Sequence, residues 1–101
     1  MKTLMIRYKT TKEGAATNEA KVHAVFDELR KARPAGLKYG TLRLADGVSF
    51  VHIAVMESPE VGDALTSLPA FKEFQKGLAA RCVEAPAITE LVAVDSYGLL
   101  A

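Results

Sequence analysis

The chain has few of the residues that build disulfides or metal sites. Its 101 residues include one cysteine, Cys82, and two histidines, His23 and His52. A single cysteine excludes a disulfide within the chain, and two histidines give no ligand cluster for a structural metal. We therefore expect no metal site and a reducing compartment.

The sequence also lacks an excess of either charge and any long apolar run. Thirteen basic and twelve acidic side chains give a net charge of +1, whereas nucleic acids and anionic membranes are bound by clustered basic residues. No segment approaches the roughly 20 apolar residues of a membrane span, and residues 1–10 lack the apolar stretch of a signal peptide. We expect a cytoplasmic protein without nucleic-acid or membrane partners.

The strongest local pattern is a predicted β-hairpin between Leu37 and Glu57, centred on Asp46-Gly47. Asp-Gly between apolar runs favours a two-residue type I′ turn, which would set Thr41 opposite His52. Side chains alternate between the two faces of a strand. One face of the hairpin is chemically mixed, with Tyr39, Thr41, Arg43, Phe50, His52 and Ala54. The other face is aliphatic, with Leu42, Val51, Ile53 and Val55.

The residues before the hairpin predict a strand and a helix. Alternating apolar residues indicate a strand over residues 3–9. The helix should begin at Thr17 or Asn18, whose side-chain oxygens suit an N-cap, and end before Pro34. Its apolar face has helical spacing and consists of Val22, Val25, Phe26 and Leu29.

The residues after the hairpin predict two helices and a last strand. Ser58-Pro59 suits the start of a short helix that ends before Pro69. The second helix should begin at Pro69 and fray around Glu84 to Pro86, with Arg81 facing outward and Cys82 as an inert core thiol. Ile88–Tyr97 has apolar residues on both faces, as expected of a strand that is covered on both sides.

The order βαββαβ predicts an α+β, ferredoxin-like fold in a single domain of residues 1–101, with two main helices on one face of a four-stranded antiparallel sheet. The other face of the sheet keeps large apolar residues on at least three strands. Such a face requires a partner, and two-fold association is the commonest solution. We expect a homodimer formed through the sheets.

Two segments carry a resemblance to a known family. Residues 50–60, FVHIAVMESPE, followed at matching spacing by residues 69–74, PAFKEF, resemble the antibiotic biosynthesis monooxygenase-like group of dimeric α+β barrels. There, a strand ending in an aromatic residue precedes a proline-histidine-phenylalanine-lysine element that opens the last helix. The resemblance implies a dimeric α+β barrel. For members that oxygenate quinol-like aromatics, it also implies a reaction carried out by pocket residues, with neither metal nor flavin as cofactor.

The chain departs from the family pattern at four positions where the family commonly has glutamate, an aromatic residue or histidine: Ala54, Met56, Leu65 and Ala70. These departures favour a protein that binds a small aromatic ligand without catalysis. The alternative is a cofactor-independent monooxygenase or isomerase acting on a phenolic or quinol-like substrate.

His52 is the candidate catalytic residue, because imidazole titrates near neutral pH and would accept a proton from a phenol. The pocket around it would be lined by Tyr8, Tyr39, Arg43, Phe50 and Phe71. A semi-buried structural histidine at the sheet or the dimer interface fits the same pattern, and we favour that role. Arg43 would either hold an anionic substrate or remain a solvated charge near the turn.

Overall fold

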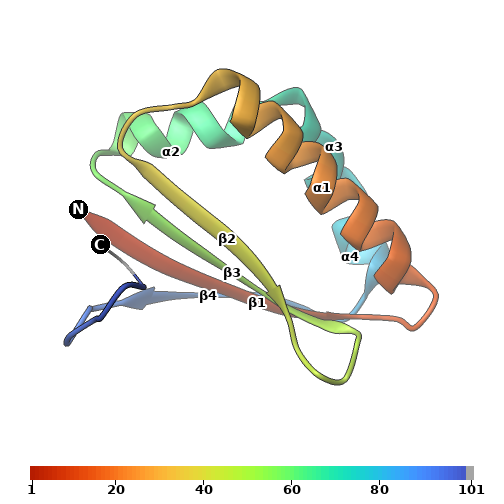
Figure 1. Cartoon of the computed structure of the whole chain (residues 1–101). Helices are drawn as coiled ribbons and strands as arrows, with labels where there is room; N and C mark the ends of the chain where they lie inside the picture. The colour runs from red at the N-terminus through yellow and green to blue at the C-terminus, as the bar shows by residue number, and fades with distance from the viewer. Residues whose placement is uncertain (100–101) are drawn as a thin grey trace.

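The computed structural model describes residues 1–99 as a four-stranded antiparallel sheet with helices packed on one face (Figure 1). In chain order the elements are β1 (Lys2–Thr10), α1 (Gly14–Ala32), β2 (Leu37–Arg43), β3 (Ser49–Met56), α2 (Pro59–Thr66), α3 (Pro69–Lys76), α4 (Leu78–Arg81) and β4 (Cys82–Leu91). The strands lie in the order β2-β3-β1-β4. This arrangement confirms the predicted α+β, ferredoxin-like fold.

The β2–β3 hairpin has the predicted register but a different turn. Thr41 pairs with His52 as expected, whereas the predicted two-residue type I′ turn is wrong. Gly47 has a φ of 79°, but Asp46 does not adopt a positive φ. Its carboxylate instead accepts hydrogen bonds from the backbone N–H groups of Val48 and Ser49, at 3.0 and 2.8 Å. The Asp46 side chain thus closes a longer loop that keeps the same register.

Helix α1 begins at Gly14, earlier than predicted. The hydroxyl of Thr11 accepts a hydrogen bond from the Gly14 N–H at 2.9 Å, so the predicted N-cap at Thr17 or Asn18 is wrong. Asn18 lies inside the helix and is fully buried. Its amide bonds to groups on other elements, and this long-range bonding replaces the local capping that the residue type suggested.

The second half of the chain differs most from expectation. The helix predicted from Pro69 to about Glu84 is interrupted at Gly77 and ends at Arg81, and Cys82 is the first residue of β4. Burial raises the pKa of the Cys82 thiol, so it remains protonated near neutral pH. Strand β4 follows directly and pairs with β1. The predicted strand limits of 88–97 are therefore wrong.

Two features explain the limits of β4. Pro86 lies at a bulge, where the register of β4 with β1 shifts. A bulge in an edge strand tolerates proline, which has no backbone N–H to donate. Pairing then ends with Leu91 opposite Thr3, close to the start of β1. Residues 92–99 therefore find no strand partner within the described part of the chain, and Val94 is 98% exposed.

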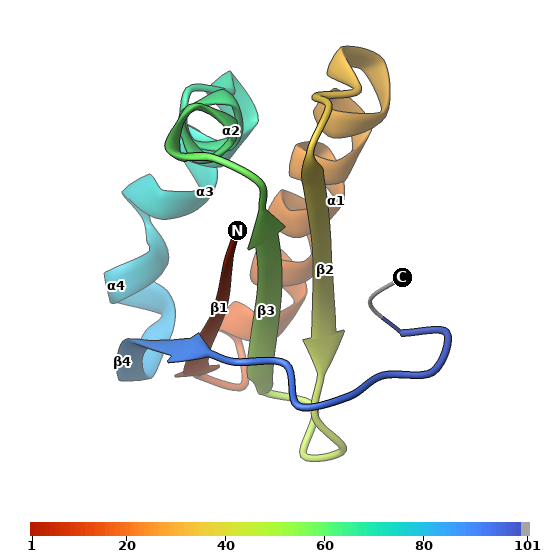
Figure 2. The same cartoon turned by 90° about the vertical axis from the view of Figure 1, so that its left-hand side faces the viewer.

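The hydrophobic core lies between the sheet and helices α1, α2 and α3. Its buried members are Tyr8, Val22, Val25, Phe50, Leu65, Phe71 and Phe74. The opposite face of the sheet carries no helix, and the segment after β4 runs across it (Figure 2). We call this surface the open face. No helix within residues 1–99 is long and apolar enough to cross a membrane.

Candidate functional site

The candidate site lies on the helix-covered face of the sheet, around His52. Strand alternation and the pairing of Ile6 with His52 place Tyr8 diagonally beside the imidazole. The Tyr8 hydroxyl is 2.7 Å from Nε2 of His52. On the other side of the ring, Nδ1 lies 2.6 Å from the Tyr39 hydroxyl and 3.1 Å from Oγ1 of Thr41. Both ring nitrogens are therefore hydrogen-bonded within the protein.

Two residues from helices extend this arrangement away from His52. Asn18, in α1, donates from Nδ2 to the Tyr8 oxygen at 2.8 Å. Arg81, at the end of α4, donates from Nε and Nη2 to Oδ1 of Asn18, at 3.3 and 3.1 Å, and from Nη2 to the backbone oxygen of Phe74 at 3.0 Å. The resulting polar network consists of Arg81, Asn18, Tyr8, His52, Tyr39 and Thr41.

Arg81 sets the direction of the bonds in the polar network. A guanidinium group donates hydrogen bonds and accepts none, so Oδ1 of Asn18 faces Arg81 and Nδ2 faces Tyr8. The Tyr8 oxygen accepts from Asn18 and, because a buried hydroxyl requires an acceptor, donates to Nε2 of His52. Nδ1 of His52 therefore carries the imidazole hydrogen and donates it toward Tyr39.

Burial keeps the ionisable members of the network uncharged, apart from Arg81. It lowers the pKa of His52 to about 4 and raises the pKa of Tyr8 to about 12. The pKa of Tyr39 is also raised, mainly by burial. Near neutral pH the imidazole is neutral and both phenols are protonated, which agrees with the bond directions inferred from Arg81.

The imidazole is enclosed. His52 is 4% exposed, and the gap bounded by His52, Phe74 and α1 is too small for a water molecule. Within residues 1–99, every buried side-chain nitrogen and oxygen has a hydrogen-bond partner. In this conformation no group of the polar network is free to take up a proton from a bound molecule.

The structure brings four of the six predicted site residues together. Tyr8, Tyr39, Phe50 and His52 lie together, and the Phe50 ring stacks on Tyr8 with centroids 5.6 Å apart. Phe71 packs in the same core against Phe74, with the two ring centroids 6.2 Å apart.

Arg43 lies apart from this cluster, although it is on the same hairpin face. Its guanidinium pairs with Glu19 at 2.9 Å, and its side chain is half exposed. The solvated role is therefore the one that this structure displays, because Arg43 is the last residue of the edge strand β2 and its side chain reaches the surface of α1 at Glu19.

Sequence reasoning missed Asn18 and Arg81. Both lie on apolar stripes: Asn18 precedes Val22 by four residues, and Arg81 follows Phe74 by seven. A polar residue at such a position was a usable signal for a buried polar contact. The prediction that Arg81 faces outward is wrong, because the side chain turns inward to Asn18 and is 8% exposed.

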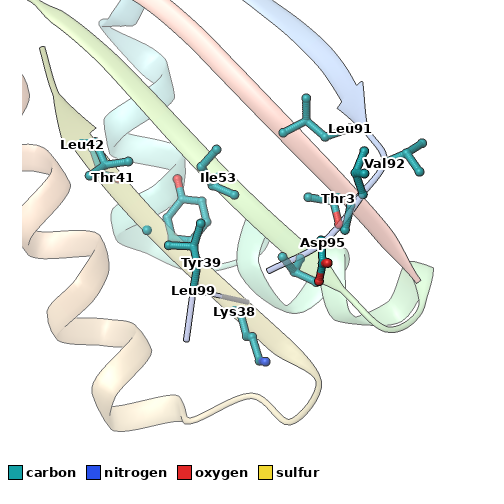
Figure 3. A pocket seen from close by; sticks show the side chains of 14 residues that line it. Thr3, Lys38, Tyr39, Thr41, Leu42, Ile53, Leu91, Val92, Asp95 and Leu99 are labelled. Atoms are coloured by element: carbon teal, nitrogen blue, oxygen red, sulfur yellow. The ribbon is translucent and has the colours of Figure 1, made fainter. Parts of the chain in front are cut away.

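Among the surface depressions outside the enclosed network, two are lined in part by Tyr39. The larger one, of about 640 Å³, is on the open face between the sheet and residues 91–95 and 99, with Leu42, Ile53 and Leu91 among its lining (Figure 3). The smaller one, of about 300 Å³, lies between the C-terminal half of α1 and the edge strand β2. We call them the open-face hollow and the edge groove. Within residues 1–99, no group of three or more His, Cys, Asp or Glu could hold a metal ion.

Comparison with known proteins establishes the fold. In sequence, the chain matches no protein-family model and no curated protein. In structure, it is similar to Rv0793 from Mycobacterium tuberculosis, with a TM-score of 0.77 and 18% identity over 94% of this chain and 96% of that one. An antibiotic biosynthesis monooxygenase gives a TM-score of 0.78 at 12% identity, over 94% of this chain and 100% of that one.

A third similar structure is SnoaB, a cofactor-independent oxygenase from Streptomyces nogalater. Its TM-score is 0.70 at 20% identity, over 96% of both chains. The chain thus has the fold of the antibiotic biosynthesis monooxygenase proteins, as its sequence resemblance implied. At these identities the similarity extends to the fold and no further.

Proposed function

We propose that this protein is a homodimeric α+β barrel that binds a small molecule and has no catalytic role of its own. The absence of a catalytic role is inferred from the enclosure of His52, whose two ring nitrogens are both hydrogen-bonded inside the protein. An imidazole with a pKa of about 4 is also a weak base for a phenol, which ordinarily titrates near 10. A general base needs direct or water-mediated access to the proton that it removes.

The open face supports the homodimer. Leu42 and Ile53 project there from neighbouring strands and line the open-face hollow with Leu91. Beyond β4, Val92, Val94, Tyr97 and Leu99 are almost fully exposed. A soluble monomer rarely exposes so much contiguous apolar surface. A second copy placed sheet to sheet would cover both features, and two-fold closure satisfies each copy with the same surface.

The edge groove supports small-molecule binding on the other side of the sheet. The open-face hollow would lie inside the dimer interface, whereas the edge groove lies beside α1 and would stay accessible. Tyr39 forms part of its wall, and the polar network fixes the orientation of the Tyr39 ring. A rigid aromatic wall at a concave surface is typical of ligand sites.

The second candidate is a cofactor-independent monooxygenase or isomerase acting on a phenolic or quinol-like substrate. A specific observation favours it: a neutral histidine lies among two tyrosines and an asparagine in a core that shares its fold with SnoaB, a cofactor-independent oxygenase. This function would require the side chains around His52 to open, because the present gap admits no substrate.

A pair of experiments separates these functions. Native mass spectrometry of the purified protein should show a dimer that carries a bound small molecule. Oxygen consumption should be absent with a panel of quinols and phenols under air. Turnover by the wild type, lost in an equally stable His52→Gln variant, would overturn the non-catalytic proposal in favour of the oxygenase, since loss of a general base typically costs about 10²–10⁴ in rate.

We further propose that residues 1–101 act as one such domain and that the protein is cytoplasmic. Residues 1–99 build one sheet with one buried core. A lone cysteine is consistent with a reducing compartment.

A further inference from the structure

We propose that the edge groove binds a small planar aromatic carboxylate, held by aromatic contact and by Arg33. This inference rests on the proposed small-molecule binding and names its site and ligand class. The groove encloses about 300 Å³, at the lower end of ligand-pocket volumes. It is lined by Phe26, Leu29, Arg30, Arg33, Pro34, Leu37 and Tyr39.

The aromatic part of the groove is held rigidly. The Phe26 and Tyr39 rings stack with centroids 5.3 Å apart and an interplanar angle of 21°. The Tyr39 hydroxyl is fixed at 2.6 Å by Nδ1 of His52. Because the network holds this ring before any ligand arrives, little side-chain entropy is lost when an aromatic molecule packs against it. This gives the buried network a role in binding without catalysis.

The charge of the groove is positive. Its lining includes two arginines and no carboxylate. Arg30 lies over the Phe26 ring at 5.9 Å and is paired with Asp27 at 3.4 Å. Arg33 takes part in none of the ion pairs or side-chain hydrogen bonds found among residues 1–99. Its guanidinium can therefore form a bidentate pair with a carboxylate, for which its planar geometry is suited.

The backbone of Arg33 gives a separate reason to assign it a role. It has φ 48° and ψ 55°, the left-handed conformation that ends a helix, and its N–H bonds to the Leu29 oxygen at 2.8 Å. Glycine is the usual residue at such a position, since a side chain there is strained. Arginine thus occupies a site where glycine would fold more easily. A strained residue at the rim of a groove is a reason to infer function.

The test uses 2-naphthoate as the probe, with 2-naphthamide as its neutral counterpart, titrated into the full-length protein by calorimetry and by amide chemical-shift changes. We expect the carboxylate to bind more tightly than the amide, with shifts centred on Phe26, Leu37 and Tyr39. Arg33→Gly should weaken naphthoate binding about fivefold or more, as loss of a charge-assisted hydrogen bond predicts. The same variant should be more stable to urea, because glycine relieves the left-handed strain.

Arg43→Gln is the matched control, since it removes an arginine from the surface far from the groove, where Arg43 pairs with Glu19. It should leave naphthoate binding unchanged. Equal affinity of Arg33→Gly and wild type would overturn the proposal and leave Arg33 as an ordinary basic residue at a helix end. Equal affinity for carboxylate and amide, or shifts centred on the open face, would also overturn it.

The same experiment separates this inference from the proposed function. Absence of naphthoate binding, together with a different small molecule found by native mass spectrometry, would overturn the groove assignment and leave small-molecule binding intact. Absence of both would overturn both proposals. Naphthoate binding that depends on Arg33 supports both.

Discussion

The Tyr8 hydroxyl lies 2.7 Å from Nε2 of His52, although 44 positions separate the two residues in the sequence. The antiparallel pairing of β1 with β3 brings them together on the helix-covered face. Tyr8 accepts from Asn18 and donates to His52, so the state of the imidazole depends on residues that it does not touch. The first two predictions concern this dependence.

Replacing Asn18 by leucine should destabilise the protein by about 2–4 kcal/mol. Simple burial and helix propensity predict the opposite sign, since the position is fully buried on an apolar stripe of α1. The loss arises because the buried Arg81 guanidinium and the Tyr8 hydroxyl would each lose a partner, at about 1–3 kcal/mol per unsatisfied group. Urea unfolding measures the effect. Thr17→Leu, one position earlier and exposed, should stay within about 0.5 kcal/mol, and an Asn18→Leu variant as stable as wild type would contradict the inferred network.

Stability should fall as the pH is lowered from about 6.5 to about 4. His52 has a folded-state pKa of about 4, below its ordinary value of 6.5, so in this window the unfolded chain binds a proton that the folded chain does not. The free energy of unfolding therefore rises with pH across this window. Below and above the window, His52 makes no contribution to the pH dependence. The pKa difference of His52 between the unfolded and folded chains corresponds to about 3 kcal/mol of stability.

The measurement is the urea midpoint of wild type and His52→Gln between pH 4 and pH 7.5. The variant should lack this component of the pH dependence, while exposed His23 is present in both proteins. Parallel pH profiles for the two proteins would show that the imidazole is not buried in its neutral form.

Gly47→Ala should destabilise the hairpin by about 1–2 kcal/mol. Gly47 has a φ of 79°, and an added Cβ would meet no atom within 4 Å, so the cost is that of the backbone conformation and not of a clash. Gly40→Ala is the matched control: it is equally uncrowded, but its φ is not positive and it lies within β2. Alanine there should be neutral or slightly stabilising. Thermal or urea unfolding compares the two, and equal effects would show that the loop does not require a left-handed residue.

Ile53→Glu should convert a dimer into a monomer. Ile53 lines the open-face hollow, and a carboxylate buried in an apolar interface without a partner carries a large desolvation cost. Sedimentation at micromolar concentration should show a dimer for wild type and a monomer for the variant. Ala24→Glu, at an exposed position of α1 on the helix side, should remain dimeric. A monomeric wild type would refute the homodimer outright.

The sequence by itself determined the elements that depend on near neighbours. Alternation fixed β1 and the two faces of the hairpin, and Ser58-Pro59 marked the start of α2. The hairpin register was predicted from a two-residue turn at Asp46-Gly47, and it holds although the turn is a longer loop. These features arise from contacts within a strand, a turn or one helical turn, which residue types and spacing describe directly. The order of elements then limited the fold to one arrangement.

Tertiary structure decided the rest, because the deciding partners are far apart in sequence. Asn18 has the residue type of a helix cap and Arg81 that of a solvated charge, yet each is buried because it satisfies the other across 63 positions. Strand β4 ends at Leu91 since its partner β1 begins at Lys2, although the apolar pattern continues to Tyr97. A local sequence pattern indicates the conformation and exposure that a residue type favours, whereas tertiary packing decides which distant group becomes its hydrogen-bond or strand partner.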